Sequence, residues 1–191
     1  MKHTSMQRLF LGIFLLFVCG VAAAHPGHDA SGFSTGFMHP LTGLDHLLAM
    51  FAVGLWAAQM GGRKIWLLPA AFMLMLVVGV NLALHPMSLP LVEPGIATSV
   101  LALGLLVALC LRLPTLLSIA ITAWFGLLHG YAHGLEMPAT APMTYALGFL
   151  CATAALHFGG IGIGIATRDR FAQITQTLGL AIAVSGAWML G

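Results

Sequence analysis

Two histidines and an aspartate, His39, Asp45 and His46, stand at the start of an apolar run, 47–58, that is suited to the interior of a membrane. Ionisable side chains are costly in hydrocarbon, and those found there usually pair with one another or bind an ion. On an ideal helix His39 and His46 share a face but lie roughly 10 Å apart along the axis, and Asp45 points about 100° away from His46. One ion therefore cannot contact both histidines if the segment is a regular helix.

The segment is not expected to be regular, because Pro40 and Gly43 interrupt it. Proline lacks the backbone donor that a helix uses, and glycine adopts torsions that other residues avoid. Broken helices at membrane depth are found where they line a cavity. We therefore expect irregular backbone from Pro40 to Gly43.

A second group of the same residue types, His129, His133 and Glu136, lies at positions i, i+4 and i+7. These positions share one face of a helix, and two histidines four residues apart can hold one divalent cation. A carboxylate one turn further along suits the same ion. Imidazole and carboxylate ligands together favour borderline ions such as nickel, cobalt and zinc.

The elements that must position these residues are membrane helices. The 191 residues are 60% hydrophobic and only 6% charged, with a mean hydropathy of +1.00, whereas soluble domains carry roughly 25% charged residues. Long apolar runs between short polar loops indicate an all-α integral membrane protein, and the net charge of +2 gives no reason to expect nucleic-acid binding. The predicted six-helix transmembrane domain, 36–191, has spans at about 36–59, 65–85, 94–111, 115–136, 143–166 and 171–190.

The positive charges beyond the N-terminal segment follow the first, third and fifth spans, and the loops after the second and fourth spans have none. Cytoplasmic loops collect Lys and Arg, so these three loops are predicted to face the cytoplasm. Both mature termini then face the periplasm, and the chain is predicted to lie in a bacterial inner membrane. The basic residues are Arg63, Lys64, Arg112, Arg168 and Arg170.

In this orientation both histidine groups lie in the outer half of the bilayer. We therefore expect His46 and Asp45 to meet His129 and His133 across a helix interface, in a site open to the periplasm. His39 is expected nearer the entrance than the centre of that site. The sequence thus predicts one metal site built from two helices.

The remaining histidines are weaker candidates for metal binding. His157 lies about fourteen residues into the fifth span, where it is either a deeper position on an ion path or a hydrogen-bonded packing residue. Residues 1–24 have the basic start, apolar stretch and small-residue end of a cleaved signal peptide. A signal anchor that is not cleaved would have a similar pattern. Cleavage would leave a periplasmic tail, 25–35, in which His25 and His28 either hold a cation loosely or are merely solvated.

Small residues recur every fourth position in two spans, at Gly126, Gly130 and Gly134 and at Gly160 and Gly164. This spacing lets membrane helices approach closely. Six spans of alternating direction also permit a 3+3 inverted repeat, a common plan among transporters. We expect close helix packing at both glycine rows.

Both histidine-containing segments resemble the signature motifs of the HupE/UreJ family of nickel/cobalt permeases. The segments read His39-Pro-x-x-Gly43-x-Asp45-His46-x-x-x-Met50 and His129-Gly-x-Ala-His133-Gly-x-Glu136. The resemblance covers essentially the whole chain. It implies uptake of nickel or cobalt from the periplasm for hydrogenase or urease maturation, and essential roles for the six His, Asp and Glu residues of the two motifs.

The predicted function is therefore that of a secondary transporter, with the metal ion as its substrate and not as a permanent cofactor. The expected partners are the divalent ion and the lipid bilayer, and the sequence contains no ATP-binding motif. Two alternatives remain: a membrane-embedded metallohydrolase, and a periplasmic metal-binding or sensor protein without transport. No His-Glu-x-x-His segment supports the hydrolase, so the protein is not expected to be an enzyme.

Overall fold

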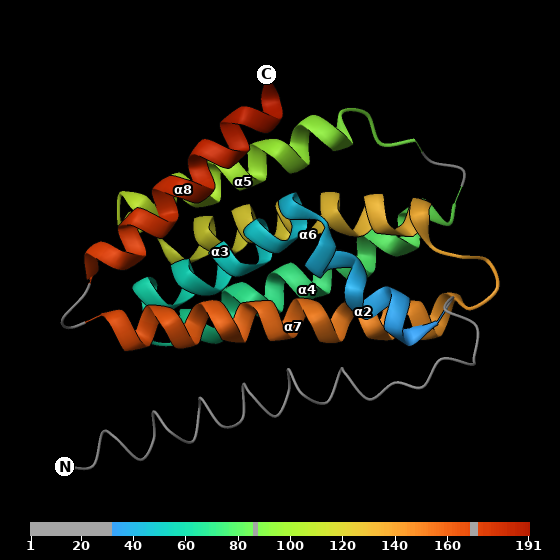
Figure 1. The fold of residues 1–191 in the computed structure, drawn as a ribbon, viewed down its shortest axis with the longest axis horizontal. Helices are drawn as coiled ribbons and strands as arrows, with labels where there is room; N and C mark the ends of the chain where they lie inside the picture. The colour runs from blue at the N-terminus through green and yellow to red at the C-terminus, as the bar shows by residue number, and fades with distance from the viewer. Residues whose placement is uncertain (1–31, 86–87, 169–171) are drawn as a thin grey trace, which may run out of the picture. The chain divides into compact units, whose positions relative to one another are not determined.

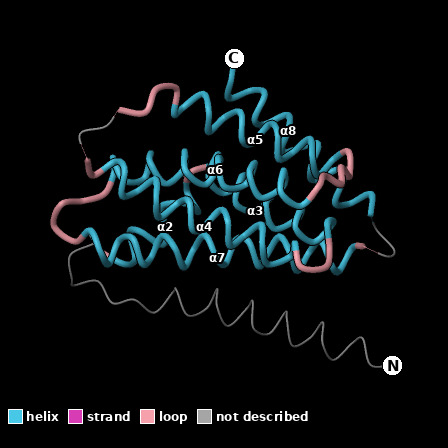
Figure 2. Tube along the Cα trace, turned by 180° about the vertical axis from the view of Figure 1, so that it is seen from behind, coloured by secondary structure: helices cyan, strands magenta, loops and turns pink. Residues whose placement is uncertain are grey.

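The computed structural model describes residues 32–85, 88–168 and 172–191. The predicted signal peptide, the histidines of the tail and Arg170 lie outside these residues. The described chain forms helices and loops and contains no strand, as Figures 1 and 2 show. Its helices are α2 (Phe33–Thr42), α3 (Leu44–Met60), α4 (Lys64–Ala83), α5 (Val92–Ala108), α6 (Thr115–Glu136), α7 (Pro142–Thr167) and α8 (Ala172–Leu190).

Proline and glycine set most of the helix ends. Pro114 directly precedes α6, and Pro142 is the first residue of α7, where its missing N–H costs no hydrogen bond. Gly61 ends α3 with a φ of 67°, a left-handed torsion that favours glycine. As a result α4 to α8 match the last five predicted spans closely, and the fourth span, 115–136, coincides with α6.

The first predicted span is broken into two helices. α2 ends at Thr42, α3 begins at Leu44, and the two axes are bent by 83° at Gly43. The expected irregular backbone is therefore confirmed, but it is confined to Gly43, whose φ of −80° and ψ of 111° are extended. Pro40 lies in the last turn of α2 and remains helical.

Several helices are long and apolar enough to cross a membrane. By length and composition α4, α6 and α7 qualify in the described part of the chain, and α2 with α3 adds a fourth crossing if the bent pair is one span. α5 is apolar but shorter, at 17 residues. The protein is a multi-pass membrane protein.

The helices pack most extensively as three pairs, α3 with α7, α4 with α6 and α5 with α8. The ribbon and the tube view from behind both show α5 and α8 side by side (Figures 1 and 2). Glycines line each contact: a Cβ at Gly130 would lie 2.0 Å from the Leu76 oxygen, and one at Gly160 would lie 2.3 Å from the Phe51 oxygen. The close packing predicted for both glycine rows is confirmed.

The loops that carry the basic residues meet at one end of the bundle. Lys64 Nζ donates to the Leu113 carbonyl at 2.9 Å, which joins the α3–α4 loop to the α5–α6 loop. The Arg168 guanidinium, after α7, lies next to Gly61. The positive charge of the described residues is therefore gathered at one end.

Candidate metal centre

The bend at Gly43 brings the two histidines of the first motif together. His39 lies near the end of α2 and His46 in the first turn of α3. Their ring centroids are 6.2 Å apart, well short of the roughly 10 Å expected along one straight helix. The break therefore places both imidazoles beside one space, which an unbroken helix could not do.

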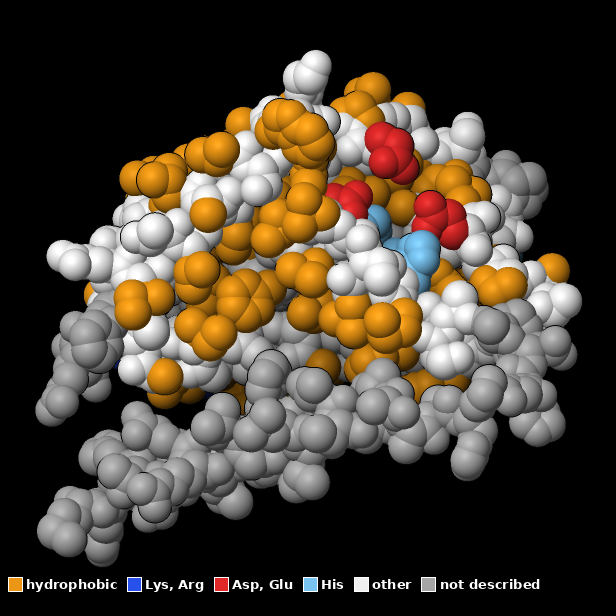
Figure 3. All heavy atoms as spheres, viewed as in Figure 1, with side chains coloured by type: hydrophobic (Ala, Val, Ile, Leu, Met, Phe, Trp, Pro, Cys, Tyr) orange, Lys and Arg blue, Asp and Glu red, His pale blue; other side chains and the backbone are white. Residues whose placement is uncertain are grey.

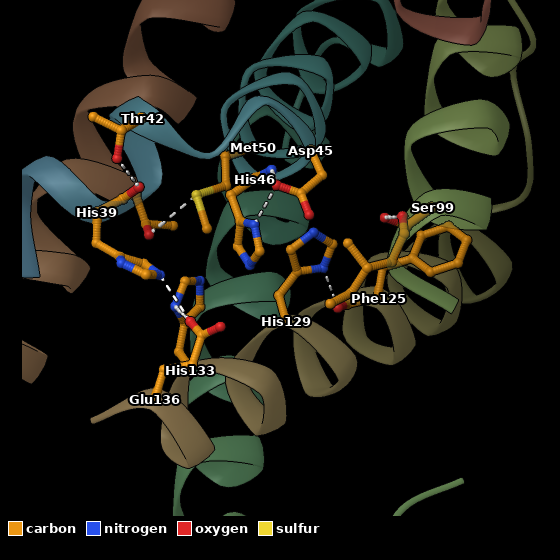
Figure 4. A network of polar contacts seen from close by, with 12 residues as sticks. His39, Thr42, Asp45, His46, Met50, Ser99, Phe125, His129, His133 and Glu136 are labelled. Atoms are coloured by element: carbon orange, nitrogen blue, oxygen red, sulfur yellow. Dashed lines mark hydrogen bonds and ion pairs between the residues drawn. The ribbon is translucent and has the colours of Figure 1, made fainter. Parts of the chain in front are cut away.

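The second motif supplies the opposite side of this space. His129 and His133 lie on one buried face of α6. The His46 ring is 4.9 Å from the His129 ring and 4.2 Å from the His133 ring, centroid to centroid. Figure 4 shows the rings from α3 and α6 pointing toward one another. The predicted meeting of His46 with His129 and His133 is confirmed.

His39 belongs to the cluster and lies nearer its entrance than its centre, as predicted. Its Nε2 lies 2.9 Å from Glu136 Oε2, and its ring centroid is 4.8 Å from that of His133. One ligand atom from each of His39, His133 and Glu136 falls within 4.8 Å of the others. His39 is nevertheless 34% exposed and Glu136 57%, so this set forms the outer edge of the cluster.

Asp45 reaches the cluster through His46. Its Oδ1 accepts hydrogen bonds from the His46 backbone N–H at 2.8 Å and from His46 Nδ1 at 2.6 Å. Successive side chains diverge by about 100° around a helix, yet the Asp45 carboxylate turns back to His46 because the first turn of a helix has free N–H groups that attract a carboxylate. A carboxylate on one imidazole nitrogen orients the ring and makes the other nitrogen a better metal ligand.

The buried imidazoles have nitrogen atoms without a hydrogen-bond partner among the described residues. These are Nε2 of His46, Nε2 of His129 and both ring nitrogens of His133. His129 Nδ1 donates to the Phe125 carbonyl at 2.9 Å, and a carbonyl only accepts, so the neutral ring presents a lone pair at Nε2. Buried polar atoms nearly always have a partner, so these nitrogens are available to a ligand that enters the cluster.

The donor set suits a divalent transition metal. Such ions are held by imidazole nitrogen and carboxylate oxygen at roughly 2.0–2.2 Å. The donors of His39 and Glu136 are on exposed or partly exposed side chains and lie within 4.8 Å of a His133 nitrogen. The arrangement can therefore capture a cation from the exposed side and pass it to buried nitrogens.

Carboxylates surround the exposed side of the cluster. The described residues contain three acidic side chains, Asp45, Glu93 and Glu136, and Figure 3 shows them on one face together with the visible edge of the histidines. Glu93 lines two hollows, one shared with Asp45 and the other with Glu136. The sequence offers one signal for Glu93, its place at the end of the bundle opposite the basic loops.

His157 is buried on α7 but is not in direct ring contact with the cluster, and its Nδ1 donates to the Met50 carbonyl at 2.7 Å. His25 and His28 lie outside the described residues.

The model of the HupE / UreJ protein family matches residues 13–189. The chain belongs to the HupE/UreJ family. It is 41% identical over 172 residues to Protein HupE of Rhizobium leguminosarum bv. viciae. The aligned residues make up 89% of this chain and 90% of that protein. No solved structure matches the chain.

Members of the HupE/UreJ family are in general transporters of nickel or cobalt. In this HupE/UreJ protein the two motifs, separated by more than eighty residues of sequence, form one spatial unit between α2, α3 and α6. Membership also agrees with the multi-pass membrane architecture of the described helices. The histidine cluster is therefore the candidate metal-binding site of this chain.

Proposed function

We propose that this chain is a secondary permease that carries nickel, with cobalt as the second candidate, from the periplasm to the cytoplasm, where it supplies hydrogenase or urease maturation. The observation that carries the proposal is the convergence of four imidazoles and two carboxylates on one partly buried space. The residues proposed to handle the ion are His39, Asp45, His46, His129, His133 and Glu136.

The charges of the cluster fit a divalent ion. An uncompensated double charge in the low-dielectric part of a membrane protein would be prohibitive. Glu136 is one of the three closest donors, and Asp45 bonds the ring of His46, so two carboxylates offset the two positive charges of the ion. The neutral imidazoles then supply ligand atoms without adding charge.

The position of the cluster between helix pairs supports transport. His46 belongs to the α3–α7 pair, and His129 and His133 belong to the α4–α6 pair. Within each pair the glycine contacts hold the backbones together, whereas imidazole rings occupy the space between α3 and α6. Rocking of one rigid unit against another is a common way to move a bound ion from one side to the other.

The helix pairing also supports the 3+3 inverted repeat. Six spans are proposed, with α2 and α3 together as the first and α4 to α8 as the others. The repeat exchanges span one with span four, span two with span five and span three with span six. Under this exchange the α3–α7 pair becomes the α6–α4 pair, and the α5–α8 pair becomes itself. The three observed pairs therefore match the symmetry that such a repeat requires.

The proposed topology follows from the charges at the two ends. The end that gathers Lys64 and Arg168 is assigned to the cytoplasm and the end with Glu136 to the periplasm of a bacterial inner membrane. Residues 1–24 are proposed to be a cleaved signal peptide. His25 and His28 would then begin the mature chain on the side from which the ion enters.

Uptake of radioactive nickel into cells tests the proposal. His46→Ala and His133→Ala are expected to abolish uptake at equal expression. His85→Ala is the matched control, because this histidine after α4 is exposed and bonds its own helix, through Nδ1 and the Asn81 carbonyl. Unchanged uptake in either cluster variant would overturn the assignment of the site, and competition with cobalt and zinc would rank the substrates.

Binding without transport is the second candidate, and the closure of the cluster on its inner side favours it. Phe72 is fully buried and its ring lies 5.5 Å from that of His129, centroid to centroid. Purified protein in liposomes that enclose a metal-sensitive dye separates the two functions. Entry of nickel supports the permease, whereas stoichiometric binding with no entry supports a sensor or binding protein.

A further inference from the structure

A second buried histidine position lies one helical turn deeper than the cluster. His157 on α7 is 1% exposed, and its Nδ1 donates to the backbone carbonyl of Met50 at 2.7 Å. Met50 follows His46 by four residues on α3, so the two side chains share a face of that helix. His157 is therefore level with the turn of α3 that follows the cluster, on the side toward the basic loops.

Two more polar atoms surround this position. Thr153 precedes His157 by four residues on α7, and its hydroxyl donates to the Phe149 carbonyl at 3.0 Å and lies 3.3 Å from Met50 Sδ. Met50 and Thr153 are both fully buried. His157 Nε2 has no hydrogen-bond partner in the described part of the chain. A free imidazole nitrogen on His157 therefore lies near the turns that carry the Met50 thioether and the Thr153 hydroxyl, and imidazole and thioether are both ligands of transition metals.

One aromatic ring contacts both this position and the cluster. The Phe72 ring on α4 lies 5.5 Å from the His129 ring and 5.2 Å from the His157 ring, centroid to centroid. Phe72 is fully buried, so it contacts protein on all sides. An ion that moves from His129 to His157 therefore passes along this ring.

The backbone of α4 cannot yield at this point. A Cβ at Gly126 of α6 would lie only 2.3 Å from the Phe72 carbonyl oxygen, so the two backbones are already in contact. Opening therefore requires rotation of the Phe72 side chain, or movement of the α4–α6 pair as a unit away from α7. Both motions change the contact between Phe72 and His157.

We propose that His157, Met50 and Thr153 form an inner metal position and that Phe72 is the gate between it and the outer cluster. The proposal rests on the proposed transport of a divalent metal ion. None of the three inner residues carries a negative charge, so the ion is held weakly there and moves on, as conduction through successive sites requires. The inner position therefore controls the rate of transport and contributes little to equilibrium binding.

His157→Asn tests this position without removing the tether between α3 and α7. The amide nitrogen of asparagine takes the place of Nδ1 and can donate to the Met50 carbonyl, whereas no atom replaces Nε2. In liposomes with an enclosed dye, the initial rate of nickel entry is expected to fall at least about ten-fold, which corresponds to about 1.4 kcal/mol on the barrier. Equilibrium binding of nickel to the purified variant should stay within about two-fold of wild type.

His85→Asn is the matched control, because His85 Nδ1 makes the same kind of bond to a backbone carbonyl, at Asn81, but is exposed. Its rate of nickel entry should not change. A wild-type rate for His157→Asn would show that His157 is only a structural tether and would overturn the proposal. Loss of equilibrium binding in that variant would also overturn it, since His157 would then belong to the outer site.

Phe72→Leu tests the gate independently and decides the case if His157→Asn does not fold. A smaller side chain should raise the rate of nickel entry at least about two-fold with unchanged equilibrium binding. An unchanged or lower rate would refute the gate. Absence of nickel entry in the wild-type protein is a different outcome, because it would refute the transport function itself.

Discussion

Adding one methyl group to α7 has opposite consequences at two glycines only two residues apart. A Cβ at Gly160 would lie 2.3 Å from the Phe51 oxygen, 2.9 Å from the Leu55 nitrogen and 3.0 Å from the Gly54 Cα. All three are backbone atoms of α3, so no side-chain rotation can relieve the overlap. A Cβ at Gly162 would meet nothing within 4 Å. We therefore expect Gly160→Ala to destabilise the protein and Gly162→Ala to leave it unchanged or slightly more stable.

The magnitude follows from the overlap at Gly160. Ordinary contact begins at 3.4 Å, so α3 and α7 must separate by about 1 Å. Overpacking of this kind costs about 1–3 kcal/mol, and an overlap with backbone falls at the upper end. For a chain of this length about 2–3 kcal/mol lowers Tm by about 5–10 °C. Gly162→Ala gains at most about 1 kcal/mol from the better helix propensity of alanine.

Thermal unfolding of the detergent-purified variants measures the difference, with tryptophan fluorescence as the signal because Trp56 on α3 is fully buried. Gly160→Ala should also slow nickel uptake, since the bond from His157 to the Met50 carbonyl crosses the same helix contact. Equal Tm values for Gly160→Ala and Gly162→Ala would refute the direct backbone contact between α3 and α7.

Two further predictions concern the outer cluster. Gly43→Ala keeps the bend, because its torsions suit any residue, but the new Cβ lies 3.2 Å from Asp45 Oδ1 and 3.4 Å from His46 Nδ1. Calorimetric titration should show nickel binding weakened by about ten-fold, with Gly32→Ala unchanged as the control. Glu93→Gln should raise the nickel concentration for half-maximal uptake about two- to three-fold at low salt, and the effect should vanish near 1 M salt if it is electrostatic capture.

The sequence predicts the helices of this protein well because proline, glycine and hydropathy act locally. α6 coincides with its predicted span, and the break near Gly43 follows from the residue types there. The choice of helix partners could not be predicted in the same way. Most of these helices are apolar on all sides, so the pattern of side chains does not indicate which face meets which neighbour.

The candidate site was predicted to the extent that it depends on residue spacing. His129 and His133 share a face of α6 because that helix is regular, and depth alone placed His46 opposite them. The position of His39 depends on the 83° bend between α2 and α3, and the size of this bend depends on tertiary packing and not on the local sequence. The pairing of Asp45 with His46 depends on free N–H groups created by the break, so it too could not be read from an ideal helix.

The order of the helix pairs has a consequence for synthesis of the protein. None of the three pairs joins helices that are neighbours in sequence, since α3 pairs with α7, α4 with α6 and α5 with α8. A chain that emerges at about 5–20 residues per second therefore inserts α3 well before α7 exists to cover it. Until α7 has been made, Asp45 and His46 stand in the membrane without their complete surroundings. Truncated chains that end before α7 should therefore be recognised as unassembled and degraded.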